Sequence, residues 1–348
     1  MKRKLFSRVL PLVLCLVLTL LTCACSTGET AVSSSQSAAV SSKEEYQPVD
    51  MTVMSLKGPT GMGISKLWYD SDAGAAANNY TFKLSSDPTE VSAAVIKGEV
   101  DVAAVPTNLA STLYSKTNGN VRVIALNTMG VLYMLEKGET IKSVSDLKGK
   151  KICATGEGAV PQFVLNYILS ANGIDPEKDV EIEYMGEHAE LATAMIAGNV
   201  VIGMLPEPNV STVLSKNSDM RIALNLTEEW EKATEKNGDQ SILTMGCLVV
   251  RKSFLDEHPE AVVKFLEEYK ASVDYVNSDP AAAATIIAGY EIVPAAPIAQ
   301  KAIPNSNMCC ITGSDMKVKL SAFLKVLYDA NPNSVGGKLP DDAFYYVK

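Results

Sequence analysis

Three polar residues, Thr107, Asn108 and Glu207, follow two prolines that end apolar segments of the chain. Thr and Asn side chains both donate and accept hydrogen bonds, whereas an ionised Glu only accepts them. Such groups suit the binding of a small polar molecule, and Pro206 and Pro208 stiffen the backbone on both sides of Glu207. A carboxylate that caps the following helix is the alternative interpretation for Glu207.

The segments before these polar residues resemble each other. Residues 94–106 read AVIKGEVDVAAVP, and residues 194–206 read AMIAGNVVIGMLP. Each predicts the end of a helix, a stop at Gly98 or Gly198, and a short apolar strand. Open parallel sheets bind ligands beyond the carboxyl ends of their strands, so two such units predict two α/β lobes that share a cleft. A single helix–Gly–strand joint is common in α/β proteins, but two that end alike favour the two-lobed interpretation.

Two glycine-rich loops add backbone groups that could reach a ligand. Each lies between a predicted strand and a predicted helix, and glycine lets the backbone approach a ligand beside the unpaired N–H groups of a helix start. The first loop contains Gly58, Pro59, Thr60, Gly61 and Met62, and the second contains Thr155, Gly156, Glu157 and Gly158. A plain tight turn is the alternative for the first loop. Glu157 is either a solvent-facing helix-start residue or a ligand-facing carboxylate.

The order of the predicted elements divides the chain into two lobes. Residues 49–136 and 246–348 are expected to form a discontinuous first lobe, and residues 137–245 the second. Strands that alternate with helices predict an α/β fold with two parallel-rich sheets flanked by helices on both faces. The predicted strand at residues 131–135 completes the first lobe in this scheme.

Two strands are expected to cross between the lobes, near residues 133–137 and 243–249. A two-strand crossing predicts a hinge, and hinge closure around a ligand would enclose it between the lobes. Tyr133 lies on one crossing strand and is the aromatic side chain best placed to stack on a ligand.

The first residues predict export from the cytoplasm. Four basic residues precede an apolar run over residues 9–21, which is too short to cross a bilayer but typical of a secretory signal. Cleavage after residue 24 would leave Cys25 as the lipidated first residue, with Cys23 or ordinary cleavage as alternatives. Residues 25–48 are rich in Ser and Ala, which predicts a disordered tether. We therefore expect a monomer on the outer face of the membrane, held by a lipid on Cys25.

The charge balance argues against nucleic acid as a partner. The chain has 31 basic and 40 acidic residues, a net charge of −9. Loss of residues 1–24 would leave 27 basic residues and a net charge near −13. Nucleic acids and anionic lipid surfaces both require a basic face.

The sequence offers little that could catalyse a reaction. His188 and His258 are the only histidines, and no Ser/His/Asp or Cys/His arrangement is visible. His188 lies between Glu187 and Glu190, but one histidine without a partner makes a poor metal site. We therefore expect no metal and no cofactor. Glu157 and Glu207, if paired in the cleft, are the one remaining candidate for an active site.

Four cysteines lie beyond the predicted signal. Cys153 and Cys247 are in apolar runs, where a disulfide between them is one interpretation and two buried thiols are the favoured one. Cys309 and Cys310 are adjacent, and no CxxC spacing occurs that would predict zinc or thioredoxin-like chemistry.

Several motifs occur together in the order seen in one protein family. They are LKGPTGM at residues 56–62, DLKGK at 146–150, LPEP at 205–208, VRKSF at 250–254 with His258-Pro259, and GGKLPDD at 336–342. The chain resembles ABC-transporter substrate-binding lipoproteins with the type II periplasmic-binding-protein fold. Within that family it is most similar to binders of sulfonates, taurine, nitrate and thiamine-related pyrimidines. The resemblance implies ligand contact at the Gly58 loop and delivery of a small molecule to the transmembrane subunits of an ABC permease.

The residues of the candidate loops favour a ligand that is not an anion. No arginine occurs in them and Lys57 is the nearest cation, whereas Glu157 and Glu207 are acidic. A neutral or cationic nitrogen heterocycle is therefore the favoured ligand. A sulfonate, taurine or nitrate anion is the alternative, and an enzyme acting on a pyrimidine-like substrate is the alternative from another class.

Overall fold

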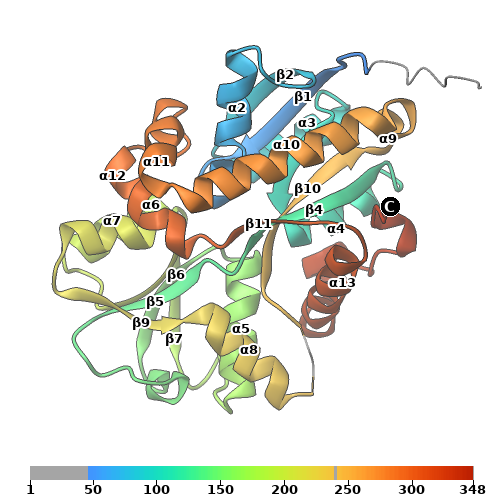
Figure 1. Ribbon diagram of the computed structural model, residues 1–348. Coiled ribbons are helices and arrows are strands. Elements are labelled where there is room, and N and C mark those ends of the chain that lie inside the picture. The colour runs from blue at the N-terminus through green and yellow to red at the C-terminus, as the bar shows by residue number, and fades with distance from the viewer. Residues whose placement is uncertain (1–45, 239–240, 348) are drawn as a thin grey trace, which may run out of the picture. The chain divides into compact units, whose positions relative to one another are not determined.

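The computed structural model describes residues 46–238 and 241–347. These residues form an α/β fold with a six-stranded sheet and a five-stranded sheet, seen in the upper and lower parts of Figure 1. We call each sheet with its helices the first and the second lobe. The predicted signal peptide, the lipidation at Cys25 or Cys23 and the tether up to residue 45 lie outside the described residues.

The first sheet has the strand order β11-β4-β10-β3-β1-β2. Strand β1 pairs in parallel with β2 and β3, whereas β10 runs antiparallel to β3 and β4, and β11 antiparallel to β4. The strands are β1 (Asp50–Leu56), β2 (Asn79–Ser85), β3 (Val102–Pro106), β4 (Val121–Met129), β10 (Thr244–Arg251) and β11 (Met308–Ile311).

The second sheet has the strand order β7-β6-β8-β5-β9. Strands β6, β7 and β8 are parallel, and β5 runs antiparallel to β8 and β9. The strands are β5 (Leu132–Lys137), β6 (Lys151–Thr155), β7 (Glu181–Met185), β8 (Ile202–Pro206) and β9 (Met220–Asn225). Both sheets are therefore mixed, because β10 and β11 run opposite to the other strands of the first sheet, and β5 runs opposite to the other strands of the second.

Helices cover both faces of the first sheet, as predicted. Alternate residues of its strands face two separate hydrophobic clusters, one with α10 and α11 and the other with α13. Long helix α10 crosses in front of the first sheet in Figure 1. The helices of this lobe are α1 (Pro59–Met62), α2 (Ser65–Asp72), α3 (Pro88–Lys97), α4 (Thr107–Lys116), α9 (Lys252–Glu257), α10 (Pro259–Ser278), α11 (Pro280–Gly289), α12 (Ala296–Ala302), η2 (Ile303–Asn305), α13 (Gly313–Ala330), η3 (Pro332–Val335) and η4 (Asp342–Phe344).

The second lobe has η1 (Val144–Leu147), α5 (Val160–Ala171), α6 (His188–Ile196), α7 (Asn209–Lys216) and α8 (Leu226–Lys236). Its α6–β8–α7 unit matches α3–β3–α4 of the first lobe, which confirms the repeat. Gly98 and Gly198 end the preceding helices with φ of 73° and 79°, a conformation that favours glycine.

The prediction that residues 131–135 complete the first lobe is wrong. Strand β5 starts at Leu132 and pairs only with strands of the second sheet. The apolar sequence of β5 would suit a central strand of either sheet, so hydrophobicity alone could not show to which sheet β5 belongs. Residues 129–132 form the first passage between the sheets, and residues 241–244 lead back to β10.

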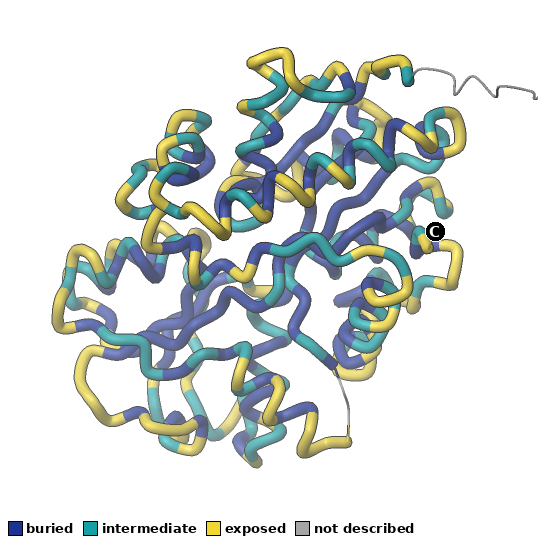
Figure 2. The backbone as a smooth tube through the Cα atoms, in the orientation of Figure 1, coloured by how far each residue is buried: buried dark blue, intermediate teal, exposed yellow. Residues whose placement is uncertain are grey.

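One hydrophobic cluster is continuous across both lobes. It includes Val123 and Leu126 of the first sheet, Met134 of the second, and Trp230 packed against Phe323 at 5.3 Å between ring centroids. Figure 2 shows this burial as dark tube along the strands, with exposed residues on the outer turns of the helices. Helices α8 and α13, from different lobes, therefore share one core.

All four cysteines of the described residues are free thiols, so Cys153 and Cys247 do not form a disulfide. They lie in different sheets, and both are buried. Cys309 and Cys310 point to opposite sides of β11, since they pack against different hydrophobic clusters. Across residues 46–238 and 241–347, none of the helices has the length and apolar composition to cross a membrane.

Candidate functional site

Glu207 is a buried carboxylate at the carboxyl end of β8. Only 1% of the residue is exposed, and its oxygens accept hydrogen bonds from the Ser211 N–H and hydroxyl, each at 3.0 Å. Burial raises the pKa of Glu207 to about 7, against the lowering effect of these donors. Ser211 lies one turn into α7, so the capping role considered from the sequence is present. No basic side chain pairs with Glu207 among the described residues.

Asn305 of the first lobe connects Glu207 to Tyr133. The Asn305 side-chain amide donates to Glu207 Oε1 at 3.5 Å, and the Tyr133 hydroxyl donates to the Asn305 carbonyl at 3.0 Å. Tyr133 is 5% exposed, and burial together with the Glu207 and Glu228 carboxylates raises its pKa to about 12. The structure thus brings together Tyr133 and Glu207, which are 74 residues apart in the sequence, through a residue that the sequence patterns did not select.

Thr155, at the end of β6, is joined to His188. Its hydroxyl lies 2.6 Å from Nδ1 of His188, the first residue of α6, and Thr155 is 1% exposed. Burial lowers the pKa of His188, with the Glu187 carboxylate acting in the opposite direction. Thr155 ends β6, and His188 lies shortly after the end of the neighbouring strand β7. A search of the sequence for polar residues at strand ends would therefore have identified His188 as a candidate. Its neighbours in the sequence, Glu187 and Glu190, had suggested only a metal ligand.

The rest of the second glycine loop is more exposed. Glu157 is exposed, and the Gly158 N–H donates to the Gln162 side chain at 2.7 Å. Gly156 and Gly158 have φ of 78° and 71°, which accounts for glycine at both positions. Glu157 is the loop's one charged side chain, and it remains accessible.

The first glycine loop is largely occupied by its own contacts. The N–H groups of Gly61 and Met62 donate to the Gly58 carbonyl, and that of Gly58 donates to the Ile292 carbonyl. The Met62 side chain is fully buried in the core of the first lobe, so its prediction as a ligand contact gains no support. Core residues from distant parts of the chain pack around it, which its position in the loop did not reveal.

The loop nevertheless lies against the second lobe. A Cβ added to Gly58, whose φ is 87°, would be 3.6 Å from Cδ of Pro208. Pro208 directly follows Glu207, so this loop and the end of β8 face each other. Pro59 and Thr60 are partly exposed there.

Thr107 and Asn108 bond within the first lobe. The buried Thr107 hydroxyl donates to the Thr244 carbonyl at 2.8 Å, and the Asn108 amide donates to the Ser334 carbonyl at 3.2 Å. Their prediction as ligand-facing side chains gains no support, because these donors already have partners in β10 and η3.

Buried polar atoms without partners gather beside the two passages. Asn127 Oδ1, Thr128 Oγ1 and Thr244 Oγ1 are among them, and each of these residues is at most 2% exposed. The Asn127 amide donates to the Thr60 carbonyl at 3.5 Å, so it supports the first glycine loop. An apolar strand pattern conceals such residues, and none of them was selected from the sequence.

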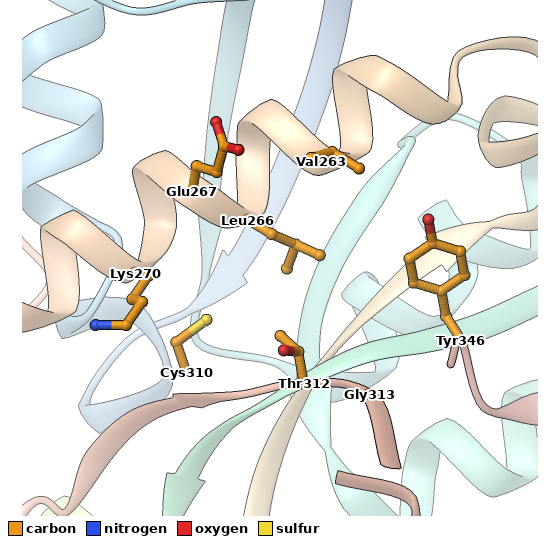
Figure 3. A pocket seen from close by; sticks show the side chains of 8 residues that line it. All are labelled: Val263, Leu266, Glu267, Lys270, Cys310, Thr312, Gly313 and Tyr346. Carbon is orange, nitrogen blue, oxygen red and sulfur yellow. The ribbon is translucent and has the colours of Figure 1, made fainter. Parts of the chain in front are cut away.

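A separate hollow of about 320 Å³ lies on the first lobe, between α10 and the chain from β11 to α13 (Figure 3). Leu266 and Cys310 lie within it, and the Glu267 carboxylate points away. Its lining residues are Val263, Leu266, Glu267, Lys270, Cys310, Thr312, Gly313 and Tyr346, none of which belongs to the predicted site.

The fold defines the class of protein. The structure superposes with a TM-score of 0.72 on an ABC transporter protein from Parabacteroides distasonis, at 22% identity over 86% of this chain and 99% of the other. The TM-score is 0.67 with the periplasmic aliphatic sulphonate binding protein SsuA of Escherichia coli, at 16% identity over 85% and 96%. With the nitrate-binding protein NrtA of Synechocystis PCC 6803 it is 0.52, at 13% identity over 70% and 67%. The chain has the two-lobed fold of periplasmic binding proteins, as predicted.

The family follows from the sequence. The family model described as NMT1/THI5 like matches residues 79–283, more than half of the chain, and the chain belongs to this family. Two curated relatives are the binding protein YtlA of Bacillus subtilis (strain 168), 29% identical over 126 residues, and the 4-amino-5-hydroxymethyl-2-methylpyrimidine phosphate synthase of Aspergillus parasiticus, 25% identical over 218 residues. These matches cover 36% and 57% of this chain, and only 34% and 57% of the two relatives.

Proposed function

We propose that this protein is the extracytoplasmic solute-binding component of an ABC importer. It captures a small polar molecule between its lobes and delivers it to the transmembrane permease subunits. The fold it shares with the Parabacteroides and SsuA proteins supports this role, as does the local similarity to YtlA. The lipid on Cys25, the location outside the cytoplasm and the monomeric state belong to the same proposal.

The favoured ligand is a neutral or cationic nitrogen heterocycle, and Glu207 is the observation that carries this choice. A buried carboxylate without a basic partner is costly, and burial has raised its pKa to about 7. A ligand with N–H donors or a positive charge would stabilise the ionised form. Tyr133 supplies an aromatic face beside it.

An anionic ligand fits these residues less well. SsuA and NrtA are named for sulphonate and nitrate, but they are only 16% and 13% identical to this chain. An anion beside Glu207 would be repelled by its carboxylate, and Lys57, the cation nearest the first glycine loop in sequence, is exposed.

An enzyme is the second candidate function, favoured by the similarity to the Aspergillus synthase. A pyrimidine-forming enzyme would need a catalytic group that touches its substrate. Glu207 is buried and Glu157 exposed, so the two carboxylates that could form a pair have different environments. Consumption of a pyrimidine-like compound that is lost in the Glu207→Gln variant would favour the enzyme.

The test is thermal unfolding of the purified protein with a panel of compounds. The panel contains aminopyrimidines and other nitrogen heterocycles, sulfonates, taurine and nitrate. A ligand present at 100 times its Kd stabilises a protein by about 2.7 kcal/mol, which raises the Tm by a few degrees. We expect a shift with a nitrogen heterocycle that is recovered unchanged.

The Glu207→Gln variant shows whether the carboxylate is responsible. Loss of a charge-assisted hydrogen bond should weaken the binding of a cationic heterocycle about 10- to 100-fold. Glu177→Gln is the matched control, because it removes an exposed carboxylate of the same lobe that lies outside the candidate loops. Tight taurine or nitrate binding that is lost on Thr60→Ala would contradict the proposed ligand class.

A further inference from the structure

The residues that lead from η2 into β11 reach the second lobe twice. Asn305 accepts a hydrogen bond from the Tyr133 hydroxyl at 3.0 Å and donates one to Glu207 Oε1 at 3.5 Å. Asn305 therefore touches both of the candidate ligand-binding side chains that the second lobe contributes near Pro206.

The same segment also contacts the first passage between the lobes. The Asn307 amide donates to the Gly130 carbonyl at 2.6 Å, and the Met129 N–H donates to the Asn307 carbonyl at 3.0 Å. Asn307 has a φ of 43°, a left-handed conformation that Asn tolerates better than most residues. The side chain of Asn305 and the start of β5 are thus held by one short stretch of chain.

This stretch is fixed in the first lobe. Ser306 is fully buried, and its hydroxyl donates to the Ala302 carbonyl at 2.7 Å. Asn277 of α10 donates to the Met308 carbonyl at 3.0 Å. When the lobes separate, Asn305 must therefore stay with the first lobe and leave Glu207 and Tyr133.

We propose that Asn305 is a positioning residue that couples the state of Glu207 to contact between the two lobes. It acts by supplying, from the first lobe, an amide donor to the carboxylate of the second. Ligand capture at Glu207 and closure of the lobes then stabilise each other. This inference rests on the proposed function in taking Glu207 as a ligand contact.

The decisive experiment is small-angle X-ray scattering of the ligand-free protein at pH 8.5. The samples are the wild type, Asn305→Ala, Asn305→Asp, the double variant Asn305→Asp/Glu207→Gln, and the control Asn172→Ala. Asn172→Ala removes a comparable side-chain amide bond, to the Ile168 carbonyl at 2.8 Å, that stays inside the second lobe. Circular dichroism establishes that each variant is folded.

We expect a larger radius of gyration for Asn305→Ala, which lacks the donor, and for Asn305→Asp, which places two carboxylates together. The double variant exchanges the two groups, so the amide at position 207 can donate to the carboxylate at position 305. Its radius of gyration should therefore return to the wild-type value, and that of Asn172→Ala should not differ from the wild type. Equal values for all samples, or no recovery in the double variant, would overturn the inference.

A binding measurement separates this inference from the proposed function. The probe is 4-amino-5-hydroxymethyl-2-methylpyrimidine, and Asn305→Ala should release it about tenfold faster with little change in association rate. Unchanged release from Asn305→Ala would also count against the coupling. If the wild type does not bind the probe, this pyrimidine is not its ligand, and scattering still decides the role of Asn305.

Discussion

Glu157 and Glu207 show how burial gives the same residue type different chemistry. Both follow parallel strands of the second sheet, but Glu157 is exposed whereas Glu207 is 1% exposed and held by Ser211 and Asn305. Burial raises the pKa of Glu207, and there a ligand cation would replace the lost solvation. This difference favours Glu207 as the determinant of ligand charge.

The raised pKa of Glu207 predicts how stability depends on pH. Its folded pKa of about 7 lies above the ordinary value of 4.5, so the folded state binds more protons between these values. Wild-type stability should therefore fall as pH rises through this window, by up to about 3 kcal/mol from this group. Glu207→Gln removes the group. Between pH 5 and pH 8, the free energy of unfolding measured with urea should therefore fall more for the wild type than for the variant.

Glu157→Gln is the control for this measurement, because it removes an exposed carboxylate of the same lobe and leaves Glu207 in place. Parallel pH profiles for the wild type and Glu207→Gln would show that Glu207 ionises in the folded protein as it does in solvent.

Part of the site could be predicted from strand ends alone. Glu157 and Glu207 follow apolar strands whose limits are clear in the sequence, and Thr155 is the last residue of one of these strands. Asn305 could not be found in this way, because its contacts with Tyr133 and Glu207 depend on how the lobes meet. The contacts of Thr107 and Met62 could not be predicted for a related reason, because their partners, Thr244 and the first-lobe core, come from distant parts of the chain.

At the scale of elements, the repeat was predictable because each helix–Gly–strand unit is local. The strands of its two copies are β3 and β8, and helices α4 and α7 follow them in the chain. The sheet membership of β5 was not predictable, since an apolar strand fits either sheet and its neighbours β8 and β9 are about 70 to 90 residues later. The position of the passage between the sheets could therefore be found only from the structure.

Gly130 in this passage predicts a test of the crossing. A Cβ there would collide with Thr227 Oγ1 and lie 3.0 Å from Leu243 Cδ2, so the two passages and α8 close in on this glycine. Gly130→Ala should lower the free energy of unfolding by about 2 kcal/mol or more, because the added methyl group overpacks the passage. Gly289→Ala, with nothing within 4 Å of the added atom, should not be destabilised. If Gly130→Ala and the wild type had equal free energies of chemical unfolding, the passage would have room for the added methyl group.

At the scale of the whole described region, the lobes are joined by more than their two passages. The cluster around Trp230, Phe323 and Leu320 continues from the second sheet into the first, while Phe265 and its neighbours form a core in the first lobe alone. The proposed hinge motion would therefore leave the α8–α13 side packed while the Asn305 side separates. A pivot at α8–α13 would place the moving surfaces near Glu207, where the ligand is proposed to bind.

The shared core predicts that both lobes unfold together. In a Trp68→Phe variant, Trp230 is the single tryptophan left and reports on the second lobe. Its fluorescence should change at the same urea concentration as the far-ultraviolet circular dichroism of the whole chain.

Phe323→Ala in this background should lower the free energy of unfolding by about 3–5 kcal/mol. It should also make the Trp230 transition come first, because the second lobe loses its contact with α13. Phe265→Ala is the matched control, a buried Phe of the first lobe that should move both transitions together to lower urea without making the Trp230 transition come first. Separate transitions in the Trp68→Phe protein itself would mean that each lobe is stable alone and that the α8–α13 contact does not couple them.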